Sequence, residues 1–208
     1  MRVMVRSFSV FAVFMLTAAG VSIGSDCPEI EKLRSHYREK PFISANFAQL
    51  TTSDVFDEVD TLKGSVWAGW EGRFRLSMPN QVLASNGILY WSYSAENQQV
   101  IIDSVSRLGQ WNPLTLLYDP QQVYRCQGQR TVDDLLEFDM AAVDSSISPT
   151  RFTLRVRKDD YQPKALIYKD DNDSRIEVKI TEFYRRQSLP DSLFEFHPGP
   201  GVEVITMP

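Results

Sequence analysis

Few residues of this chain have the types and spacing that catalysis requires. Its two histidines, His36 and His197, lie far apart in the sequence, and the chain has no glycine-rich phosphate loop and no G-x-S-x-G motif. The acidic pairs Asp133-Asp134 and Asp159-Asp160 are each adjacent, so in a strand their side chains would point to opposite faces. Such pairs are better explained as turn or helix-start residues than as a catalytic dyad. The sequence therefore predicts that the protein is not an enzyme.

The first 24 residues have the three parts of a secretory signal peptide. Arg2 and Arg6 supply positive charge, Val10–Leu16 is purely apolar, and small residues follow up to Gly24. The apolar run is too short and too interrupted for a span of about 20 residues, which favours a cleaved signal over a membrane anchor. Asp26 stands directly before Cys27, where lipidation requires a small residue. We therefore expect an exported, unlipidated protein after cleavage of residues 1–24.

Two cysteines, Cys27 and Cys126, are the remaining candidates for chemistry. We expect no metal site and no cofactor, because the chain lacks a Cys-x-x-Cys motif and a pair of histidines at ligand spacing. An even cysteine count in an oxidising compartment favours a disulfide, and two buried free thiols are the alternative. The predicted bridge would join the start of the exported chain to its middle.

The exported part, residues 25–208, has the length of one domain with a hydrophobic core. The whole chain contains 22 basic and 27 acidic residues, a formal net charge of −5, and no stripe of Lys and Arg. This balance argues against nucleic acid as a partner. Because no repeat, linker or low-complexity stretch interrupts the chain, we expect a single domain.

Local patterns predict one helix at the start of this domain and another near its middle. Within residues 26–41, the apolar Ile30, Leu33 and Tyr37 recur at helical spacing among charged residues. Asn112-Pro113 has the residue types that begin a helix, and a nearly all-apolar stretch follows it. Each helix needs an apolar surface to cover.

Most other periodic segments alternate as strands do. The clearest is Gly72–Met78, in which Phe74, Leu76 and Met78 share one face. The other face carries Arg73, Arg75 and Ser77. Asn86-Gly87 has the residues of a tight hairpin turn. Residues 132–140 fit either a helix or a strand. The other expected strands are residues 43–51, 64–70, 88–93, 98–103, 152–156, 165–168, 176–183, 193–196 and 202–205.

About nine to eleven strands in chain order, joined by short turns, predict one antiparallel sheet. A single large sheet hides its apolar face only by curling, and two short helices would then close the concave side. The expected fold class is mainly β: an unclosed antiparallel half-barrel with a helical lid over a hydrophobic cavity. The excess of large apolar residues fits either an ordinary core or a cavity for an apolar ligand. These residues are Trp67, Trp70, Phe74, Leu76, Met78, Leu83, Trp91, Trp111, Leu114, Leu116 and Leu117.

Several short motifs follow one another in an order that is similar to that of a known family. Ala45–Gln49 looks like its F-x-Q strand, Gly64–Trp67 like its G-x-[LV]-W strand, and Ser85–Gly87 like its hairpin turn. Asn112–Leu117 is similar to its mid-chain apolar helix, and Phe194–Val202 to its closing F-x-F signature. Over nearly the whole exported part, the chain resembles the outer-membrane lipoprotein carrier family (LolA).

The resemblance implies a periplasmic carrier whose cavity takes the acyl chains of a lipoprotein. It implies a lipoprotein-releasing ABC transporter of the inner membrane as donor, a lipoprotein receptor of the outer membrane as acceptor, and a monomeric carrier between them. The residues that would line the cavity are Leu33, Phe47, Phe74, Leu76, Met78, Leu83, Trp91, Leu114, Leu116 and Leu117.

One turn departs from the family pattern. The family often carries an Arg-Pro pair after the G-x-[LV]-W strand, and that Arg is tied to the lid and to one-way transfer. Trp70 and Glu71 stand in this place, so the lid loses a fork of hydrogen-bond donors. We assign both residues to the gating turn. The alternative to a sorting carrier is a LolA-like lipid-binding or sensor domain with a different lipid or envelope cargo.

Overall fold

The computed structural model describes residues 27–38, 42–53, 58–107 and 123–207. Their strands form one sheet of twelve, in the order β12-β6-β5-β4-β3-β2-β1-β11-β10-β9-β8-β7. Neighbouring strands are antiparallel except β12 and β6, which are parallel. The strands are β1 (Phe42–Ser53), β2 (Glu58–Ala68), β3 (Arg73–Met78), β4 (Gln81–Asn86), β5 (Leu89–Ser94), β6 (Gln99–Ser104), β7 (Tyr124–Val132), β8 (Leu135–Ala142), β9 (Arg151–Arg157), β10 (Pro163–Lys169), β11 (Arg175–Arg186) and β12 (Glu203–Thr206).

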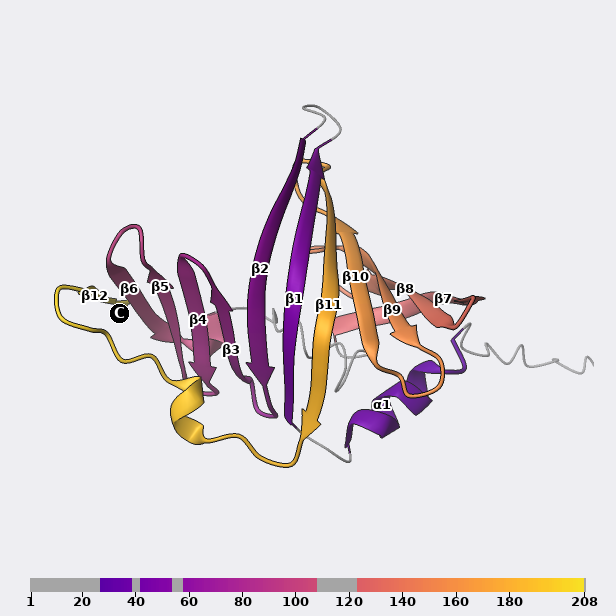
Figure 1. Cartoon of the computed structure of the whole chain (residues 1–208), viewed down its shortest axis with the longest axis horizontal. Coiled ribbons are helices and arrows are strands. Elements are labelled where there is room, and N and C mark those ends of the chain that lie inside the picture. Colours follow the sequence, from indigo (N-terminus) through magenta and orange to yellow (C-terminus); the bar gives the residue numbers. More distant parts are fainter. Residues whose placement is uncertain (1–26, 39–41, 54–57, 108–122, 208) are drawn as a thin grey trace, which may run out of the picture.

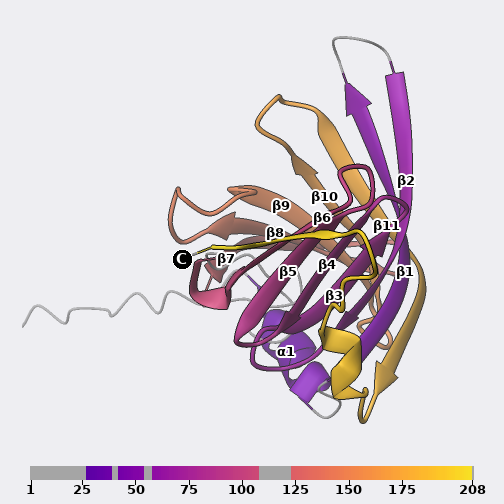
Figure 2. The same cartoon turned by 90° about the vertical axis from the view of Figure 1, so that its left-hand side faces the viewer.

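The sheet twists and curves without closing, so β7 and β12 remain its two edges (Figure 1). The helix α1 (Ile30–Arg38) packs on one side of it, and the short 3-10 helix η2 (Asp191–Phe194) lies beside β3 and β4 (Figure 2). A second 3-10 helix, η1 (Val105–Arg107), follows β6. We call the face that carries α1 the inner face and the other the outer face. The expected unclosed, mainly antiparallel sheet is confirmed, whereas the signal peptide and the expected helix from residue 112 lie outside the described residues.

The main hydrophobic core lies on the inner face, between α1 and strands β7–β10. Ile30, Leu33 and Tyr37 of the helix are each no more than 1 % exposed, as the helical spacing predicts. Strand alternation places the partners opposite them, because side chains two apart share a face. Those partners include Tyr124, Leu136, Phe138, Met140, Phe152, Leu154 and Val156.

Polar contacts hold α1 in place at both ends. At its start, Tyr161 donates a hydrogen bond to the Glu29 carboxylate (2.6 Å). In its last turn, the Tyr37 hydroxyl donates to the carbonyl of Tyr161 (2.8 Å), and Arg185 contacts the imidazole of His36 and donates to the His36 carbonyl. His36 is therefore a half-buried anchor of the helix.

The Tyr161 anchor predicts a loss of stability in alkali. Burial, and then the hydrogen bond to Glu29, raise the pKa of Tyr161 to about 12 from an ordinary value of 10.0. The folded state thus holds its proton more tightly, and this contribution is complete below about pH 10 and lost as the pH rises towards about 12. The fall in urea midpoint between about pH 9 and about pH 11 should be smaller for Tyr161→Phe than for the wild type. An equal fall in both proteins would contradict this role for Tyr161.

A second, smaller core lies on the outer face beneath the C-terminal segment. Ala84, Trp91 and Val100 are buried there, and Phe196 stacks on Tyr93 with ring centroids 4.7 Å apart. The expected strand over residues 193–196 is wrong, because this segment begins as η2 and crosses the sheet instead of joining it. The chain returns to the sheet as β12, which adds to the β6 edge.

The arginines of β3 hold this C-terminal segment on the outer face. Arg73 pairs with Asp191 (3.0 Å), and its guanidinium lies 5.2 Å from the centroid of the Phe42 ring and 5.7 Å from that of Phe194. Arg75 donates to the carbonyls of Leu193 and Glu195. The expected alternation, in which Arg73 and Arg75 lie on the face of β3 that does not carry Phe74, is confirmed. Both arginines lie on the outer face because their partners in the C-terminal segment are there.

Close packing beneath the Phe42 ring predicts that Gly69→Ala is destabilising. A Cβ at Gly69 would lie 2.6 Å from Cε1 of Phe42, and that ring is confined by Arg73 and Phe194. Overpacking of this kind costs about 1–3 kcal/mol, which a lower urea midpoint would report. Gly128→Ala is the matched control, because a Cβ there meets nothing within 4 Å. Equal midpoints for the two variants would show that the ring moves freely.

Candidate functional site

Outside the area that α1 seals, the inner face presents a contiguous set of half-buried apolar side chains. Leu76 of β3 pairs with Val66 of β2 and with Leu83 of β4, and Met78 follows Leu76 on the same face. Side chains directly opposite one another in a sheet are about 5 Å apart, so these four form one surface. We call Val66, Leu76, Met78 and Leu83 the inner apolar patch.

Buried residues border this patch on the inner face. Phe47 of β1 lies over Gly64, whose missing Cβ leaves room for the ring: a Cβ there would lie 2.5 Å from Cζ of Phe47. Phe74 is 4 % exposed and Leu33 is fully buried. These three expected cavity residues therefore belong to the inner-face core, and Leu33 joins α1 to the sheet without offering free surface.

One expected cavity residue lies on the wrong face. Trp91 pairs with Ala84 and Ile102, which share the outer face, and it is buried there with Val100. The interpretation of Trp91 as a cavity residue is therefore wrong. Its inner-face neighbours on β5 are Tyr90 and Ser92, because alternation reverses at each residue. Leu114, Leu116 and Leu117 lie outside the described residues.

Towards β5 the patch borders on polar side chains. Gln81 of β4 pairs with Met78 on one side and with Ser94 on the other, and Ser92 lies opposite Leu83. Burial raises the pKa of the nearby Tyr90 hydroxyl, so that group remains neutral at ordinary pH. The patch is thus an apolar surface bordered on one side by an uncharged margin of hydrogen-bonding side chains, Gln81, Ser92 and Ser94. The shape and polarity of such a surface suit an apolar ligand.

The predicted gating turn joins β2 to β3. Glu71 is exposed with a φ of 60°, followed by Gly72 at 73°, and Trp70 packs against the main core. The amide of Gly69 donates to the carbonyl of Arg73 (2.8 Å), which closes the turn. Its role in gating remains a prediction.

Cys27 and Cys126 form a disulfide that joins the start of α1 to the edge strand β7, across a sequence separation of 99 residues. Glu29 reinforces this junction, because its amide donates to the side-chain oxygen of Gln129 on the same strand (2.9 Å). The start of α1 is therefore covalently attached to the β7 edge of the sheet.

Val66 is the patch residue that sequence reasoning missed. Its strand was expected, but the face that Val66 occupies depends on the register between β2 and β3. Ala68 pairs with Phe74, and this pairing brings Val66 beside Leu76. The length of the turn at 69–72 sets that register, and the sequence contains no simple signal for it.

Comparison with known proteins defines the class. The model of the family described as outer membrane lipoprotein carrier protein LolA matches residues 41–197. An uncharacterized conserved protein from Thermus thermophilus has 14 % identity and a TM-score of 0.55, over 85 % of this chain and 98 % of the other. A LolA superfamily protein from Nitrosomonas europaea has 13 % identity and a TM-score of 0.47, over 80 % and 97 %. No curated protein sequence matches the chain.

Because the family model covers more than half of the sequence, the chain belongs to the LolA family of outer membrane lipoprotein carrier proteins. Its fold is LolA-like. Proteins of this family are carriers or binding proteins of the cell envelope. Among the described residues, no helix is both long and apolar enough to cross a membrane.

Proposed function

We propose that this protein is a periplasmic carrier that binds lipoprotein acyl chains on its inner face and moves them from the inner to the outer membrane. The inner apolar patch is the observation that supports this function most strongly. Its side chains are half-buried although they lie on the same face as a fully buried core. A contiguous apolar surface that the protein leaves partly open commonly marks a binding site.

The patch suits acyl chains because it is apolar across three strands and adaptable at Met78. Each CH₂ group that leaves water on binding contributes about 0.8 kcal/mol, so a short stretch of an acyl chain supplies most of the affinity. An unbranched methionine side chain adjusts to ligands of differing shape. The uncharged margin of Gln81, Ser92 and Ser94 would face the polar end of the lipid.

The donor and the acceptor of such a carrier belong to the same proposal. An inner-membrane lipoprotein-releasing ABC transporter would load the protein, and an outer-membrane lipoprotein receptor would unload it. Handover requires modest net affinity, which the half-buried state of the patch supports. The gating turn at Trp70 and Glu71 would affect release.

Incubating the purified protein with membranes that contain a triacylated lipoprotein tests this function. We expect a soluble 1:1 complex, seen by native mass spectrometry as protein plus lipoprotein. If the lipoprotein stays in the membrane at every carrier concentration, the carrier function is wrong. Co-purification of a different lipid would instead support a LolA-like lipid-binding domain with another cargo.

A further inference from the structure

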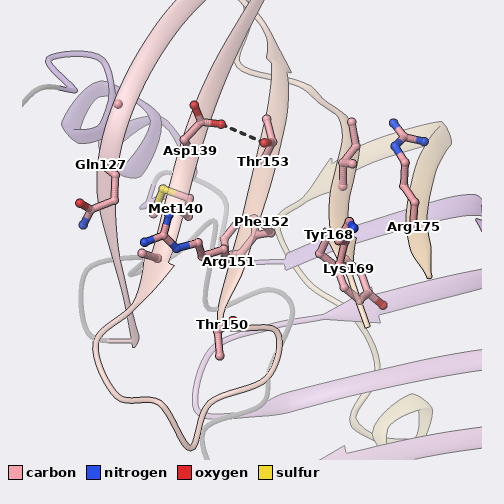
Figure 3. Close-up of a pocket in the computed structure, with 13 residues that line it drawn as sticks. Gln127, Asp139, Met140, Thr150, Arg151, Phe152, Thr153, Tyr168, Lys169 and Arg175 are labelled. Atoms are coloured by element: carbon pink, nitrogen blue, oxygen red, sulfur yellow. Dashed lines mark hydrogen bonds between the residues drawn. The ribbon is translucent and has the colours of Figure 1, made fainter. Parts of the chain in front are cut away.

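A second surface lies on the outer face, at the opposite side of the sheet from the inner apolar patch. It is an open groove of about 750 Å³ across strands β7–β11 (Figure 3). Basic, hydroxyl and apolar side chains from five strands line it, together with the carboxylate of Asp139. We call it the outer basic groove and define it by Thr150, Arg151, Thr153, Ile167, Lys169 and Arg175.

The basic side chains of the groove lie side by side across neighbouring strands. Lys169 of β10 pairs directly with Arg175 of β11. Arg151 of β9 lies next to Lys169, because the residues beside them, Phe152 and Tyr168, are paired. Like charges directly opposite one another in a sheet are destabilising, so this row has a cost in the free protein.

The row continues beyond the groove towards the sheet edge. Arg125 of β7 and Arg151 pair with the same residue, Ala141 of β8, from its two sides. Four basic side chains thus follow one line across β7–β11. Strands are about 4.8 Å apart, so the line is about 19 Å long. All four are exposed to solvent.

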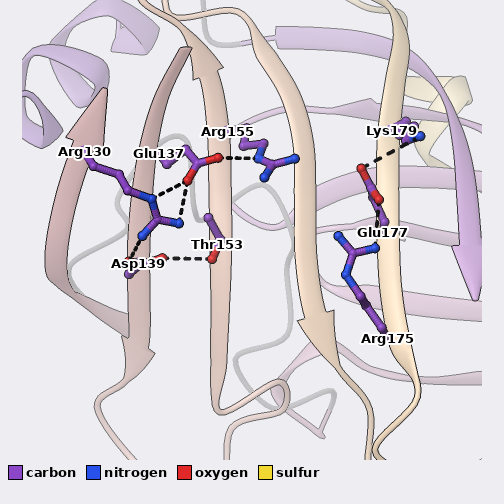
Figure 4. A network of polar contacts seen from close by, with 8 residues as sticks. All are labelled: Arg130, Glu137, Asp139, Thr153, Arg155, Arg175, Glu177 and Lys179. Atoms are coloured by element: carbon purple, nitrogen blue, oxygen red, sulfur yellow. Dashed lines mark hydrogen bonds and ion pairs between the residues drawn. The ribbon is translucent and has the colours of Figure 1, made fainter. Parts of the chain in front are cut away.

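Two acids lie on the outer face near this row, and one of them, Asp139, lines the groove, but both are already paired with other side chains. Glu137 is held between Arg130 (2.6 Å) and Arg155 (2.7 Å), and Asp139 pairs with Arg130 (2.7 Å) and Thr153 (2.9 Å), as Figure 4 shows.

Within the groove, acidic side chains neutralise the positive charges only weakly or in part. Lys169 has an exposed partner, Asp173, at 3.6 Å, and Arg175 pairs with Glu177 at 2.9 Å. Arg151 makes no ion pair among the residues that the structure describes. The groove therefore retains positive charge within a protein whose net charge is −5.

We propose that the outer basic groove binds an extended acidic segment of a protein partner. Carboxylates would bind Arg151 and Lys169, the hydroxyl of Thr150 would donate a hydrogen bond, and Ile167 would contact the apolar part of the segment. The hydroxyl of Thr153 already donates to Asp139 and does not count as a free donor. Arginine and lysine make their strongest hydrogen bonds with carboxylates and similar anions. The site is independent of acyl-chain binding, because it occupies the other face of the sheet.

Shape and charge favour a peptide over an anionic membrane surface. A single segment enters a groove, whereas a bilayer meets only the rim. A membrane also presents its charge to the whole acidic protein, whereas a bound segment interacts mainly with charges within about 8 Å at physiological salt. The net charge of −5 therefore opposes docking on an anionic bilayer more than it opposes binding of one segment.

Fluorescence anisotropy with a labelled nine-residue peptide of alternating Glu and Thr tests the proposal. We expect binding that weakens as salt is raised, and at least a tenfold loss of affinity in the double variant Arg151→Gln/Lys169→Gln. A Gln–Thr peptide of the same length should not bind. The variant should melt at or above the wild-type temperature, because it removes like charges that face each other.

The double variant Lys63→Gln/Lys158→Gln is the matched control, since it removes the same charge from exposed sites outside the groove. It should bind the peptide within about twofold of the wild type. An equal loss of peptide affinity in both variants would show that only net charge matters, and would contradict the proposed site. So would the absence of peptide binding, or binding only to vesicles containing anionic phosphatidylglycerol.

Discussion

Leu76→Glu should abolish acyl-chain binding and leave the protein folded. Leu76 lies at the centre of the inner apolar patch, with Val66 and Leu83 opposite it on the two neighbouring strands. A bound acyl chain would remove the new carboxylate from water without a partner, which costs several kcal/mol. We expect at least a 100-fold loss of affinity, or about 3 kcal/mol, for a fluorescent fatty acid in a titration.

The matched control places the same charge one residue away on the opposite face. Ser77→Glu lies on the same strand and is also half-buried, but its side chain points to the outer face. It should bind the fatty acid with wild-type affinity. Both variants should retain a cooperative urea transition, because Leu76 is outside the sealed core. Wild-type binding by Leu76→Glu would show that the ligand lies elsewhere.

Loss of the Cys27–Cys126 disulfide should cause a large loss of stability. The bridge closes a loop of 99 residues, and a cross-link of that length stabilises a fold by about 4–5 kcal/mol when it acts through the unfolded chain. The double variant Cys27→Ser/Cys126→Ser should therefore lose a large part of the roughly 5–15 kcal/mol that is typical of a domain. Urea unfolding of the variant beside the oxidised wild type measures this loss.

Reduction of the wild-type protein provides the control for side-chain changes at the two sites. Cys27 is fully buried, so the serine hydroxyl adds a polar cost that reduction does not. The reduced wild type should lose most of the stability that the double variant loses. A loss below about 1 kcal/mol in the reduced protein would mean that the Glu29, Tyr37 and Arg185 contacts hold α1 without the bridge.

Local periodicity is sufficient to predict the helices and strands that bury only one face. The alternation at residues 72–78 predicted β3 and both of its faces, and the spacing of Ile30, Leu33 and Tyr37 predicted α1 and its buried side. Compartment and cysteine count predicted the pairing that the structure contains. In each case the deciding information lies within a few residues or in the composition.

Trp91 shows why the rest of the site could not be predicted. The largest side chain of β5, Trp91, lies on the outer face because the C-terminal segment covers that face, whereas the inner face carries Tyr90 and two serines. The contact between Tyr93 and Phe196 spans 103 residues of sequence, and no local pattern reports it. The strand expected at residues 193–196 is wrong because the same long-range packing, and not sheet pairing, decides this segment. Its apolar alternation serves this packing and not a sheet register.

The strands that the sequence did not predict are those with weak alternation. β4 has Val82, Leu83 and Ala84 in succession, so neither face is distinguished. β7 is an edge strand with many polar side chains, and a bulge between Cys126 and Gly128 interrupts its pairing with β8. Tertiary pairing decides such segments, and local propensity does not.

Photo-crosslinking tests the central claim most directly. A triacylated lipopeptide with a diazirine in one acyl chain would be bound, irradiated and located by peptide mass spectrometry. Binding on the inner face predicts adducts on Val66, Leu76, Met78 or Leu83. Adducts confined to the outer face, on Trp91 or Tyr93 for example, would contradict the proposed site.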